Sequence, residues 1–427
     1  MPKIKFASQG INDEILEKLG LENRYKFLNM NLPTIVNEKQ MKFLQEVQNF
    51  AMEYEKSNNI DHSEEIYSYF PAFGEKGYIC RFNDFNECDI GYEESGLQIE
   101  MMRYLAVDMF DPSFSMSIGA TTLAINPCYH HHENRPEVLD VIKGLVTGKK
   151  IGCILITEPE RGSDAVHQLS TCVPQDDGSF LLTGTKMYNT NAPKATHAVA
   201  YASQEVGKGE TMGQFLIDTT WDGWNCERAG IPQVPRLWLG KEELKNLRVP
   251  KEYILGPPGK GLSNMFEGLA LERIGIAFED LGQSWGALSF AFLYTNLREQ
   301  FKQPVIRFQG VGFLLADYYS QVVIHTQALQ KFAESYDQKR EKYAGKIPKQ
   351  LMRAFELNAS QLKYSCAKLT ERVCYECANL MGGAGVNDNT LMRDLLGVSR
   401  IQEIVGGTRQ IQEYIISRGL TSLFKAI

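Results

Sequence analysis

Residues Gly261 to Arg298 read GLSNMFEGLALERIGIAFEDLGQSWGALSFAFLYTNLR. A Pro-Pro-Gly-Lys break begins at Pro257 and Gln303-Pro304 follows the stretch, so both ends carry signals typical of the limits of one long helix. Apolar side chains recur at intervals of three and four residues and predict one buried face. This face comprises Ala270, Ile274, Ala277, Phe278, Leu281, Trp285, Leu288 and Phe292.

A second stripe of the same helix is rich in glycine. Intervals of three and four residues connect Gly268, Glu272, Gly275, Glu279, Gly282 and Gly286. Each glycine inside a helix costs about 1 kcal/mol relative to alanine, so the stripe indicates that something approaches this face closely. For the glycines alone, contact with another helix is the simpler interpretation. Glu272 lies between two of them, and we predict that its carboxylate reaches a ligand lying against the bare backbone.

Composition excludes several classes of partner. The chain has 427 residues and a formal net charge of -7, without a long block of Lys or Arg. This argues against nucleic acid or an anionic membrane as the main partner. No apolar run approaches the length needed to cross a bilayer. The N-terminus lacks a signal-peptide pattern and its acidic residues disfavour a transit peptide, so we expect a cytoplasmic protein.

The cysteines and histidines predict neither disulfides nor a metal site. Nine cysteines are scattered along the chain, which is typical of reduced thiols in a cytoplasmic protein. Cys374 and Cys377 have a redox or metal spacing, but they lie in a helical pattern without a second pair, so core packing is expected. The triplet His130-His131-His132 is expected in a solvated loop.

The order of patterns predicts an α+β protein with three domains. Helical spacing dominates residues 1–150, which we interpret as an N-terminal helical domain. Short apolar or alternating runs predict a middle β-barrel-like domain over 151–250, and four helical patterns predict a C-terminal four-helix bundle over 251–427. The main helical stretches are 38–55, 93–117, 136–145, 262–300, 308–343, 349–381 and 399–424.

Two polar segments of the predicted β domain are candidates for binding a flat ligand. Thr157-Glu-Pro-Glu-Arg-Gly-Ser-Asp164 directly follows a buried strand, and its hydroxyls and turn amides can hold a heterocycle or a phosphate. Tyr188 and Thr190 close the following strand two residues apart, so both side chains point to one face. A purely structural loop and a tyrosine corner without ligand are the alternatives.

Two glycine-rich segments lie near the C-terminus. Met381–Gly385, with Asn379 before it, ends a helical pattern, and such turns let backbone amides approach a phosphate. No strand precedes this cluster, so it is not a dinucleotide-fold fingerprint. Val405–Gln410 opens the last helix, where Thr408 is a candidate N-cap and the first amides can attract a carbonyl or an anion.

Taken together and in this order, the segments make the chain resemble the acyl-CoA dehydrogenase family of flavoproteins, over about residues 142–420. The first 135 residues match poorly. The resemblance implies an FAD cofactor, an acyl-CoA thioester substrate and an electron-transfer flavoprotein as electron acceptor. The strings that carry it are ITEPERGSDA from Ile156, GTKMYNTN from Gly184, ALERIGIA from Ala270, REQFKQPVIRFQGVGFLLAD from Arg298, LMGGAGVND from Leu380 and IVGGTRQIQ from Ile404.

Position by position, the resemblance implies a divided FAD site. Ile156, Thr157 and Ser163 would border the flavin ring, with Ser163 near the substrate as well. Tyr188, where the family usually has tryptophan, and Thr190 would cover the ring near N5. The residues implied for the dinucleotide half and its closing contacts are Arg298, Gln300, Phe301, Gln309, Asn379, Gly382, Gly383, Thr408 and Gln410. In the family a neighbouring subunit supplies part of this half, so we expect a homo-oligomer, which is at least a dimer and, as in the family, a dimer of dimers.

The family's reaction removes the α-proton of a thioester and transfers the β-hydride to flavin N5. It needs a carboxylate base and donors to the thioester oxygen. The usual base position holds Gly406 here, whereas isovaleryl and long-chain members carry the base on the long helix, at the position matching Glu272. The resemblance also implies substrate contacts for Arg273 and for the glycine turn, Gly406 and Gly407. Ala270 replaces an aspartate that usually contacts the pantetheine arm.

Three hypotheses follow. The first is an FAD-dependent acyl-CoA dehydrogenase with Glu272 as base, for a branched, cyclic or otherwise bulky acyl group. The second keeps the fold and the flavin but is an acyl-CoA oxidase or a flavin monooxygenase, and the presence of Glu272 disfavours the monooxygenase. The third is a non-catalytic paralogue, which would purify without bound flavin.

Overall fold

The chain divides into two compact units. The structure, a computed structural model, describes residues 13–60, 62, 65–88, 91, 95–387 and 390–426. The first unit, here the helical unit, comprises Met1–His62, Gly96–Ser115 and Ile274–Ile427. The second, here the sheet unit, comprises Ser63–Ser95 and Met116–Arg273.

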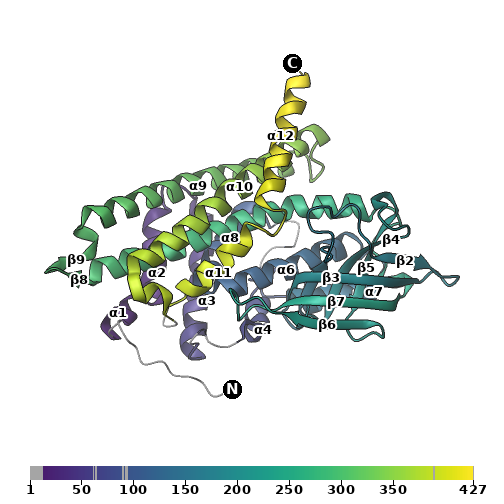
Figure 1. Cartoon of the computed structure of the whole chain (residues 1–427), viewed down its shortest axis with the longest axis horizontal. Coiled ribbons are helices and arrows are strands. Elements are labelled where there is room, and N and C mark those ends of the chain that lie inside the picture. Colours follow the sequence, from purple (N-terminus) through teal and green to yellow (C-terminus); the bar gives the residue numbers. More distant parts are fainter. Residues whose placement is uncertain are drawn as a thin grey trace. The chain divides into compact units, whose positions relative to one another are not determined.

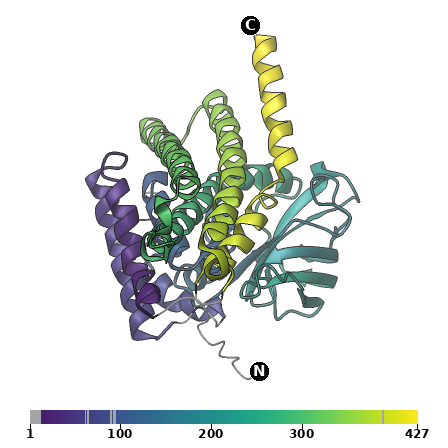
Figure 2. The same cartoon turned by 60° about the vertical axis from the view of Figure 1, so that its left-hand side comes forward.

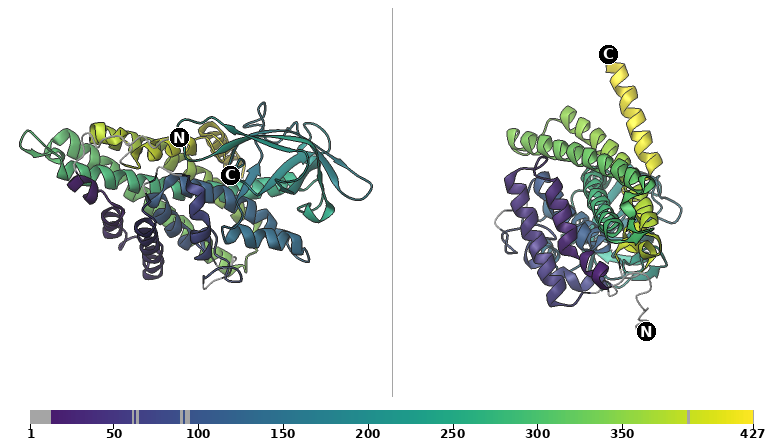
Figure 3. Two further views of the ribbon diagram at one scale, coloured as in Figure 1. Left: turned by 90° about the horizontal axis from the view of Figure 1, so that it is seen from below. Right: turned by 90° about the vertical axis from the view of Figure 1, so that its left-hand side faces the viewer.

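The helical unit is built from long helices with sequence-encoded ends (Figures 1 and 2). In α3, Asn37 Oδ1 accepts from the Gln40 backbone N–H at 2.9 Å and Gln40 Oε1 accepts from the Asn37 N–H at 3.2 Å, a reciprocal cap. Figure 3 shows α2 and α3 side by side, as α9 and α10 are in Figure 2. The helices are α1 (Asp13–Lys18), α2 (Leu21–Asn31), α3 (Glu38–Ser57), α5 (Leu97–Phe110), the later part of α8 (Gly261–Leu297), α9 (Gln309–Lys342), α10 (Lys349–Met381), α11 (Met392–Gln402) and α12 (Arg409–Ala426).

The predicted apolar face of α8 forms the centre of the helical unit. Its residues from Ile274 to Leu288 are buried, whereas Phe292 near the end of the helix is 39% exposed. Trp285 is fully buried, and its Nε1–H donates to Thr326 Oγ1 of α9 at 3.1 Å. A hydrogen bond of 2.8 Å between the hydroxyls of Ser284 and Thr370 connects α8 to α10. The single long helix predicted from the sequence is therefore confirmed.

The glycine stripe of α8 has two different environments. A Cβ placed at Gly282 would lie 2.6 Å from Asp108 Cβ of α5, and at Gly275 it would lie 3.3 Å from the Tyr104 hydroxyl. At Gly286 the nearest atom, of Leu395, would be 3.5 Å away. At Gly268, in the sheet unit, a Cβ would meet no atom within 4 Å. Helix contact therefore accounts for the later glycines, while Gly268 faces open space.

The sheet unit contains a seven-stranded mixed sheet together with α4 (Phe70–Glu75), most of α6 (Pro112–His130), α7 (Pro136–Val146) and the start of α8 (Figure 1). β4 pairs in parallel with β1 and antiparallel with β5, and β3 lies antiparallel between β2 and β7, which also pairs with β6. The core includes Leu182, Ala200, Phe215, Ile217 and Leu247. The strands are β1 (Gly152–Leu155), β2 (Thr171–Pro174), β3 (Phe180–Thr190), β4 (His197–Ser203), β5 (Met212–Asp218), β6 (Trp224–Ala229) and β7 (Leu239–Val249).

The expected fold class, with N-terminal helices, a middle β domain and a C-terminal helical domain, is confirmed. Two helix predictions were wrong. The stretch 93–117 forms two helices, because Asp111 leaves helical geometry at φ -157° and Pro112 begins α6. The stretch 399–424 is interrupted between α11 and α12, where Gly406 and Gly407 adopt φ of +64° and +96°. Within the described residues, no helix has both the length and the apolar character needed to cross a membrane.

The close approach at Gly282 predicts opposite effects for two alanine substitutions on one stripe. Gly282→Ala would push a methyl group into Asp108 and should lower the free energy of unfolding by about 1–3 kcal/mol. Gly286→Ala has room for the methyl group and should be neutral or stabilising by up to about 1 kcal/mol. Urea unfolding of both variants measures the difference, and equal stability of the two would contradict the packing described for α8.

Candidate active site

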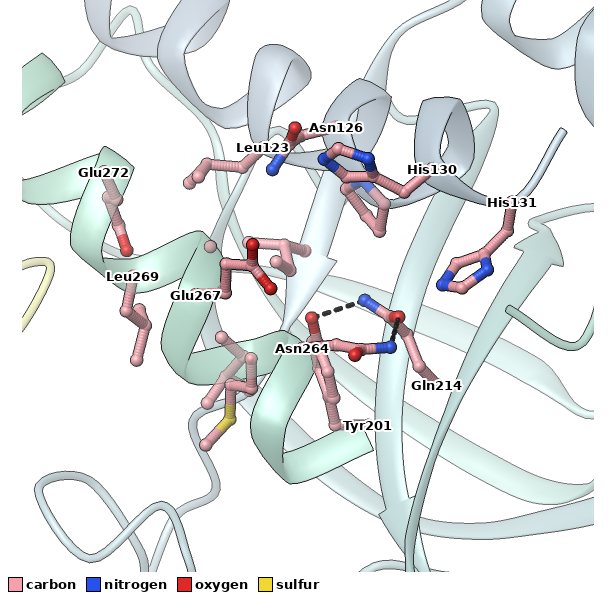
Figure 4. A pocket seen from close by; sticks show the side chains of 15 residues that line it. Leu123, Asn126, His130, His131, Tyr201, Gln214, Asn264, Glu267, Leu269 and Glu272 are labelled. Atoms are coloured by element: carbon pink, nitrogen blue, oxygen red, sulfur yellow. Dashed lines mark hydrogen bonds between the residues drawn. The ribbon is translucent and has the colours of Figure 1, made fainter. Parts of the chain in front are cut away.

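A cavity of about 250 Å³ lies within the sheet unit (Figure 4). The residues around it come from α6, the end of β1, β4, β5 and the first turns of α8. Ligand pockets commonly measure about 300–1,000 Å³, so this cavity suits a small group rather than a whole coenzyme A ester. Its lining residues are Leu123, Asn126, Pro127, His130, His131, Ile154, Ile156, Tyr201, Gln214, Asn264, Met265, Glu267, Gly268, Leu269 and Glu272.

One face of α8 forms a wall of the cavity. Asn264, Gly268 and Glu272 follow each other at intervals of four residues and therefore lie along one side of the helix, over about 12 Å. Gly268 leaves the middle of this wall without a side chain. Glu272, the predicted base, is half-buried at one end, where Figure 4 shows it together with Leu269. The space beside Glu272 predicted from the glycine stripe is therefore present at Gly268.

A polar network lies at the other end of this wall. Asn264 Nδ2 donates to Gln214 Oε1 at 3.1 Å, and Gln214 Nε2 donates to the Tyr201 hydroxyl oxygen at 2.6 Å (Figure 4). Burial, assisted by the charge of Glu272, raises the pKa of Tyr201 well above its usual value even though the Gln214 bond lowers it. Tyr201 is therefore a neutral phenol at physiological pH.

The histidine triplet agrees with its prediction only in part. His130 is exposed and is the last residue of α6, whereas His131 and His132 follow in a loop and are half-buried. His130 and His131 line the cavity. Burial, the charge of Arg135 and the neighbouring His130 lower the pKa of His131 below its usual value, so its imidazole is neutral at pH 7. Among the described residues, no group of three His, Cys, Asp or Glu could hold a metal ion.

The loop after β1 is held by a buried ion pair. Glu158 accepts from the backbone N–H groups of Leu169 and Ser170 at 2.6 and 2.9 Å and from Lys186 Nζ at 3.0 Å. Lys186 also donates to the Ile156 carbonyl at 3.2 Å. These contacts fix the backbone of Ile156, whose side chain lines the cavity. Glu158 therefore has a structural role in the loop Thr157–Asp164, which we predicted from the sequence to bind a ligand.

The end of β3 presents Tyr188 beside this loop. A register shift between Met187 and Asn189 forms a bulge in which Tyr188 has φ +64° and is 51% exposed. The Met187 N–H donates to the Thr157 carbonyl at 2.9 Å, so the bulge lies against the loop. Thr190 is half-buried at the end of the strand, and Ser163 is exposed in the loop. An outward-facing aromatic ring at a bulge is a surface on which a flat heterocycle can stack.

The residues predicted for the dinucleotide half lie on exposed parts of the helical unit. Arg298 follows α8, Gln300 and Phe301 belong to the hairpin of β8 (Glu299–Gln300) and β9 (Gln303–Pro304), and Gln309 begins α9. All four side chains are exposed, and Phe301 is 88% exposed.

Two glycine turns complete the set of predicted positions in the helical unit. Asn379 is exposed, Gly382 has φ +60°, and a Cβ at Gly382 or Gly383 would meet no atom within 4 Å, so the backbone there is open to a ligand. The Ile411 N–H donates to Thr408 Oγ1 at 3.4 Å, which confirms Thr408 as the N-cap of α12.

The second glycine turn, Gly406 and Gly407 before α12, is held by hydrogen bonds to its two carbonyl groups. Lys363 Nζ donates to the Gly407 carbonyl at 3.0 Å, and Gln412 Nε2 donates to the Gly406 carbonyl at 3.0 Å. Gln410, the second residue of α12, is exposed. Arg273 is half-buried and directly follows Glu272 on α8.

Sequence reasoning missed the polar half of the cavity. Tyr201, Gln214 and Asn264 come from β4, β5 and α8, and no local motif connects them. One signal was available, because Asn264 lies two helical turns before Glu272 on the same face. Glu267 also lines the cavity, and sequence reasoning missed it because no local motif marks it.

Comparison with known proteins decides the family. The family models for the acyl-CoA dehydrogenase middle and C-terminal domains match residues 153–234 and 259–421. The chain is 30% identical over 281 residues to the caffeyl-CoA reductase–Etf complex subunit CarC of Acetobacterium woodii, covering 65% of this chain and 70% of that protein. The chain belongs to the acyl-CoA dehydrogenase family. Members of this family are oxidoreductases, so the expected enzyme class is confirmed.

Further relatives support this assignment. Isovaleryl-CoA dehydrogenase of Oryza sativa subsp. japonica is 28% identical over 315 residues, covering 72% of each chain. The fold is shared with glutaryl-CoA dehydrogenase from Mycobacterium smegmatis in complex with FADH2, at a TM-score of 0.77 and 19% identity over 92% of this chain and 97% of that one.

Glu242, which holds Asn189 beside the Tyr188 bulge, is expected to make the stability of the protein depend on pH. Glu242 Oε2 accepts from Asn189 Nδ2 at 2.5 Å, and burial is the main cause that raises the pKa of Glu242 to about 7 from 4.5. Its stabilising contribution is therefore complete below pH 4.5 and is lost as the pH rises through 7. Relative to Glu242→Gln, the wild type should lose up to roughly 3 kcal/mol of unfolding free energy across this window.

Denaturant unfolding at pH 5 and pH 8 measures this difference. The control is Glu243→Gln on the same strand, because exposed Glu243 pairs with Lys245 at 2.8 Å and the pKa of Glu243 is lowered. That variant should follow the wild type between pH 5 and 8. If the unfolding free energy of Glu242→Gln changes between pH 5 and pH 8 as much as that of the wild type, Glu242 does not titrate in this range.

Proposed function

We propose that this protein is an FAD-dependent acyl-CoA dehydrogenase in which Glu272 removes the α-proton of the acyl-CoA thioester. The observation that carries the proposal is that Glu272 and Ile156 line one cavity. Ile156 occupies the position that borders the flavin ring in the family, and Glu272 the position of the base in its isovaleryl members. The cavity therefore combines the two functions that the reaction requires, a base and an edge of the flavin site.

The residues present fit FAD in both units. In the sheet unit, Tyr188 offers an exposed ring for stacking next to Thr157, with Thr190 and Ser163 nearby in the chain. In the helical unit, the open backbone at Gly382 and Gly383 suits a pyrophosphate, and the exposed hairpin residues suit the dinucleotide half. Bound FAD supplies the acceptor for the β-hydride.

The chain's own residues would carry out the proton transfer. A carboxylate base contributes by accepting the α-proton, and half-burial of Glu272 limits the water that competes with the substrate. Negative charge then develops on the thioester oxygen and needs a fixed donor. We assign this role to the main-chain amides of the turn at Gly406 and Gly407, and a substrate contact to Arg273.

The size of the cavity suits the acyl part of the substrate. About 250 Å³ can hold a short chain or one ring, while the coenzyme remains outside. Electrons would leave to an electron-transfer flavoprotein, and the Acetobacterium woodii relative is named as a subunit of a caffeyl-CoA reductase–Etf complex. Peroxide formed from acyl-CoA and air at the rate of turnover would instead identify an oxidase.

Glu272→Gln tests the base. The variant should remain yellow and bind acyl-CoA, but acyl-CoA should reduce its flavin about 10²–10⁴-fold more slowly, because the amide cannot accept the α-proton. Anaerobic stopped-flow absorbance in the visible flavin band measures this rate.

Glu267→Gln is the comparison variant, because Glu267 lines the same cavity five residues earlier on α8. Loss of flavin reduction in Glu267→Gln together with full-speed reduction in Glu272→Gln would assign the base to Glu267. Full speed in both variants would overturn the mechanism.

The exposed hairpin predicts an oligomer that retains the cofactor. Phe301→Asp places a charge on a surface that we propose a second subunit covers, so it should shift the protein towards smaller species and lower the FAD content per chain. Light scattering after size exclusion and flavin absorbance measure both effects. A wild type that is monomeric and fully loaded with FAD would contradict the shared site.

A further inference from the structure

The end of the cavity remote from Glu272 carries the hydrogen-bonded network of Asn264, Gln214 and Tyr201. The hydrogen bonds run from Asn264 to Gln214 and from Gln214 to the Tyr201 oxygen, so this oxygen acts as an acceptor and its own hydrogen remains to be donated. Among the side-chain hydrogen bonds of the described residues, the Tyr201 hydroxyl takes part in no other. Figure 4 shows its hydroxyl directed towards the cavity.

Burial makes this donor significant. Tyr201 is 2% exposed and its pKa is raised, so the hydroxyl keeps its hydrogen and has little access to bulk water. A buried donor without an acceptor is unfavourable, so an acceptor atom on a ligand gains affinity there. A hydrocarbon tail in the same place would leave the donor unmatched.

The charge of the lining excludes an anionic group. Glu267 and Glu272 both line the cavity, and no Lys or Arg is among its lining residues. A carboxylate at the remote end of the acyl group would therefore share the cavity with two further carboxyl groups, an arrangement of like charges that is unfavourable. A hydroxyl or carbonyl oxygen avoids this repulsion and still accepts from Tyr201.

We propose that the cavity selects neutral acyl groups whose end remote from the thioester carries a hydroxyl or carbonyl oxygen, and that Tyr201, held by Gln214, binds this oxygen. The proposal rests on the proposed function, because it places the α-carbon of the acyl group at Glu272. The distance from Glu272 to Asn264, two helical turns along α8, sets the length of acyl group that reaches both ends.

Matched pairs of thioesters test the proposal. Hexanoyl-CoA is compared with ω-hydroxyhexanoyl-CoA and adipoyl-CoA, and phenylpropionyl-CoA with (para-hydroxyphenyl)propionyl-CoA. Calorimetric titration of the FAD-loaded Glu272→Gln variant measures affinity without turnover, and flavin reduction in the wild type measures kcat/KM. In each pair, we expect the hydroxylated member to bind about tenfold more tightly, and adipoyl-CoA to bind more weakly than hexanoyl-CoA.

Tyr201→Phe, introduced alone and into the Glu272→Gln protein, removes only the donor. The ratio between hydroxylated and plain thioesters should then fall to about one. Tyr253→Phe is the matched control, because Tyr253 belongs to the same unit and packs against Trp221 at 5.0 Å outside the cavity lining. That variant should keep the wild-type ratio.

The outcomes separate this proposal from the function on which it rests. Equal affinity within each pair, a ratio that survives in Tyr201→Phe, or strongest binding of adipoyl-CoA or of an ω-aminoacyl-CoA would overturn the selectivity while leaving the dehydrogenase intact. Absence of flavin reduction by every thioester, plain or hydroxylated, would overturn the proposed function and the selectivity with it.

Discussion

The packing of α8 and the cavity beside it both depend on how closely other groups can approach the glycine stripe of this helix. Gly282 brings the backbone so near to Asp108 of α5 that a Cβ would overlap with it, and Gly275 and Gly286 also face neighbouring side chains. At Gly268 the same stripe faces a cavity instead. A helix that has glycine along one side can therefore pack tightly over part of its length and leave space for a ligand over another part, with Glu272 between the two.

The sheet unit holds its candidate binding groups in place through buried titratable side chains. Glu158 and Lys186 form a buried pair that also fixes the Ile156 carbonyl, while Glu242 holds Asn189 beside the Tyr188 bulge. Burial lowers the pKa of Lys186 to about 8 and raises that of Glu242 to about 7, although Glu158 opposes the change at Lys186. Binding groups held in this way lose little freedom when a ligand binds, which favours affinity.

Helix positions could be predicted because they follow from local patterns. The intervals of α8 identified its buried face. The same intervals drew attention to Glu272, whose role as the base stays a prediction. The predictions failed where a local break has no strong signal. Asp111 ends α5 although the apolar pattern continues through it, and the glycines at Gly406 and Gly407 separate α11 from α12 inside one helical pattern.

The sequence by itself determined the class of fold, the extent of α8, the N-cap at Thr408 and the position of a carboxylate in a glycine stripe, because periodicity and capping act between residues close in the chain. Only the tertiary structure decided which part of the stripe is open and which groups surround it. Tyr201, Gln214 and Asn264 meet through the pairing of β4 with β5 and the position of α8 in the sheet unit. Such contacts depend on the packing of elements distant in sequence, which residue spacing does not encode.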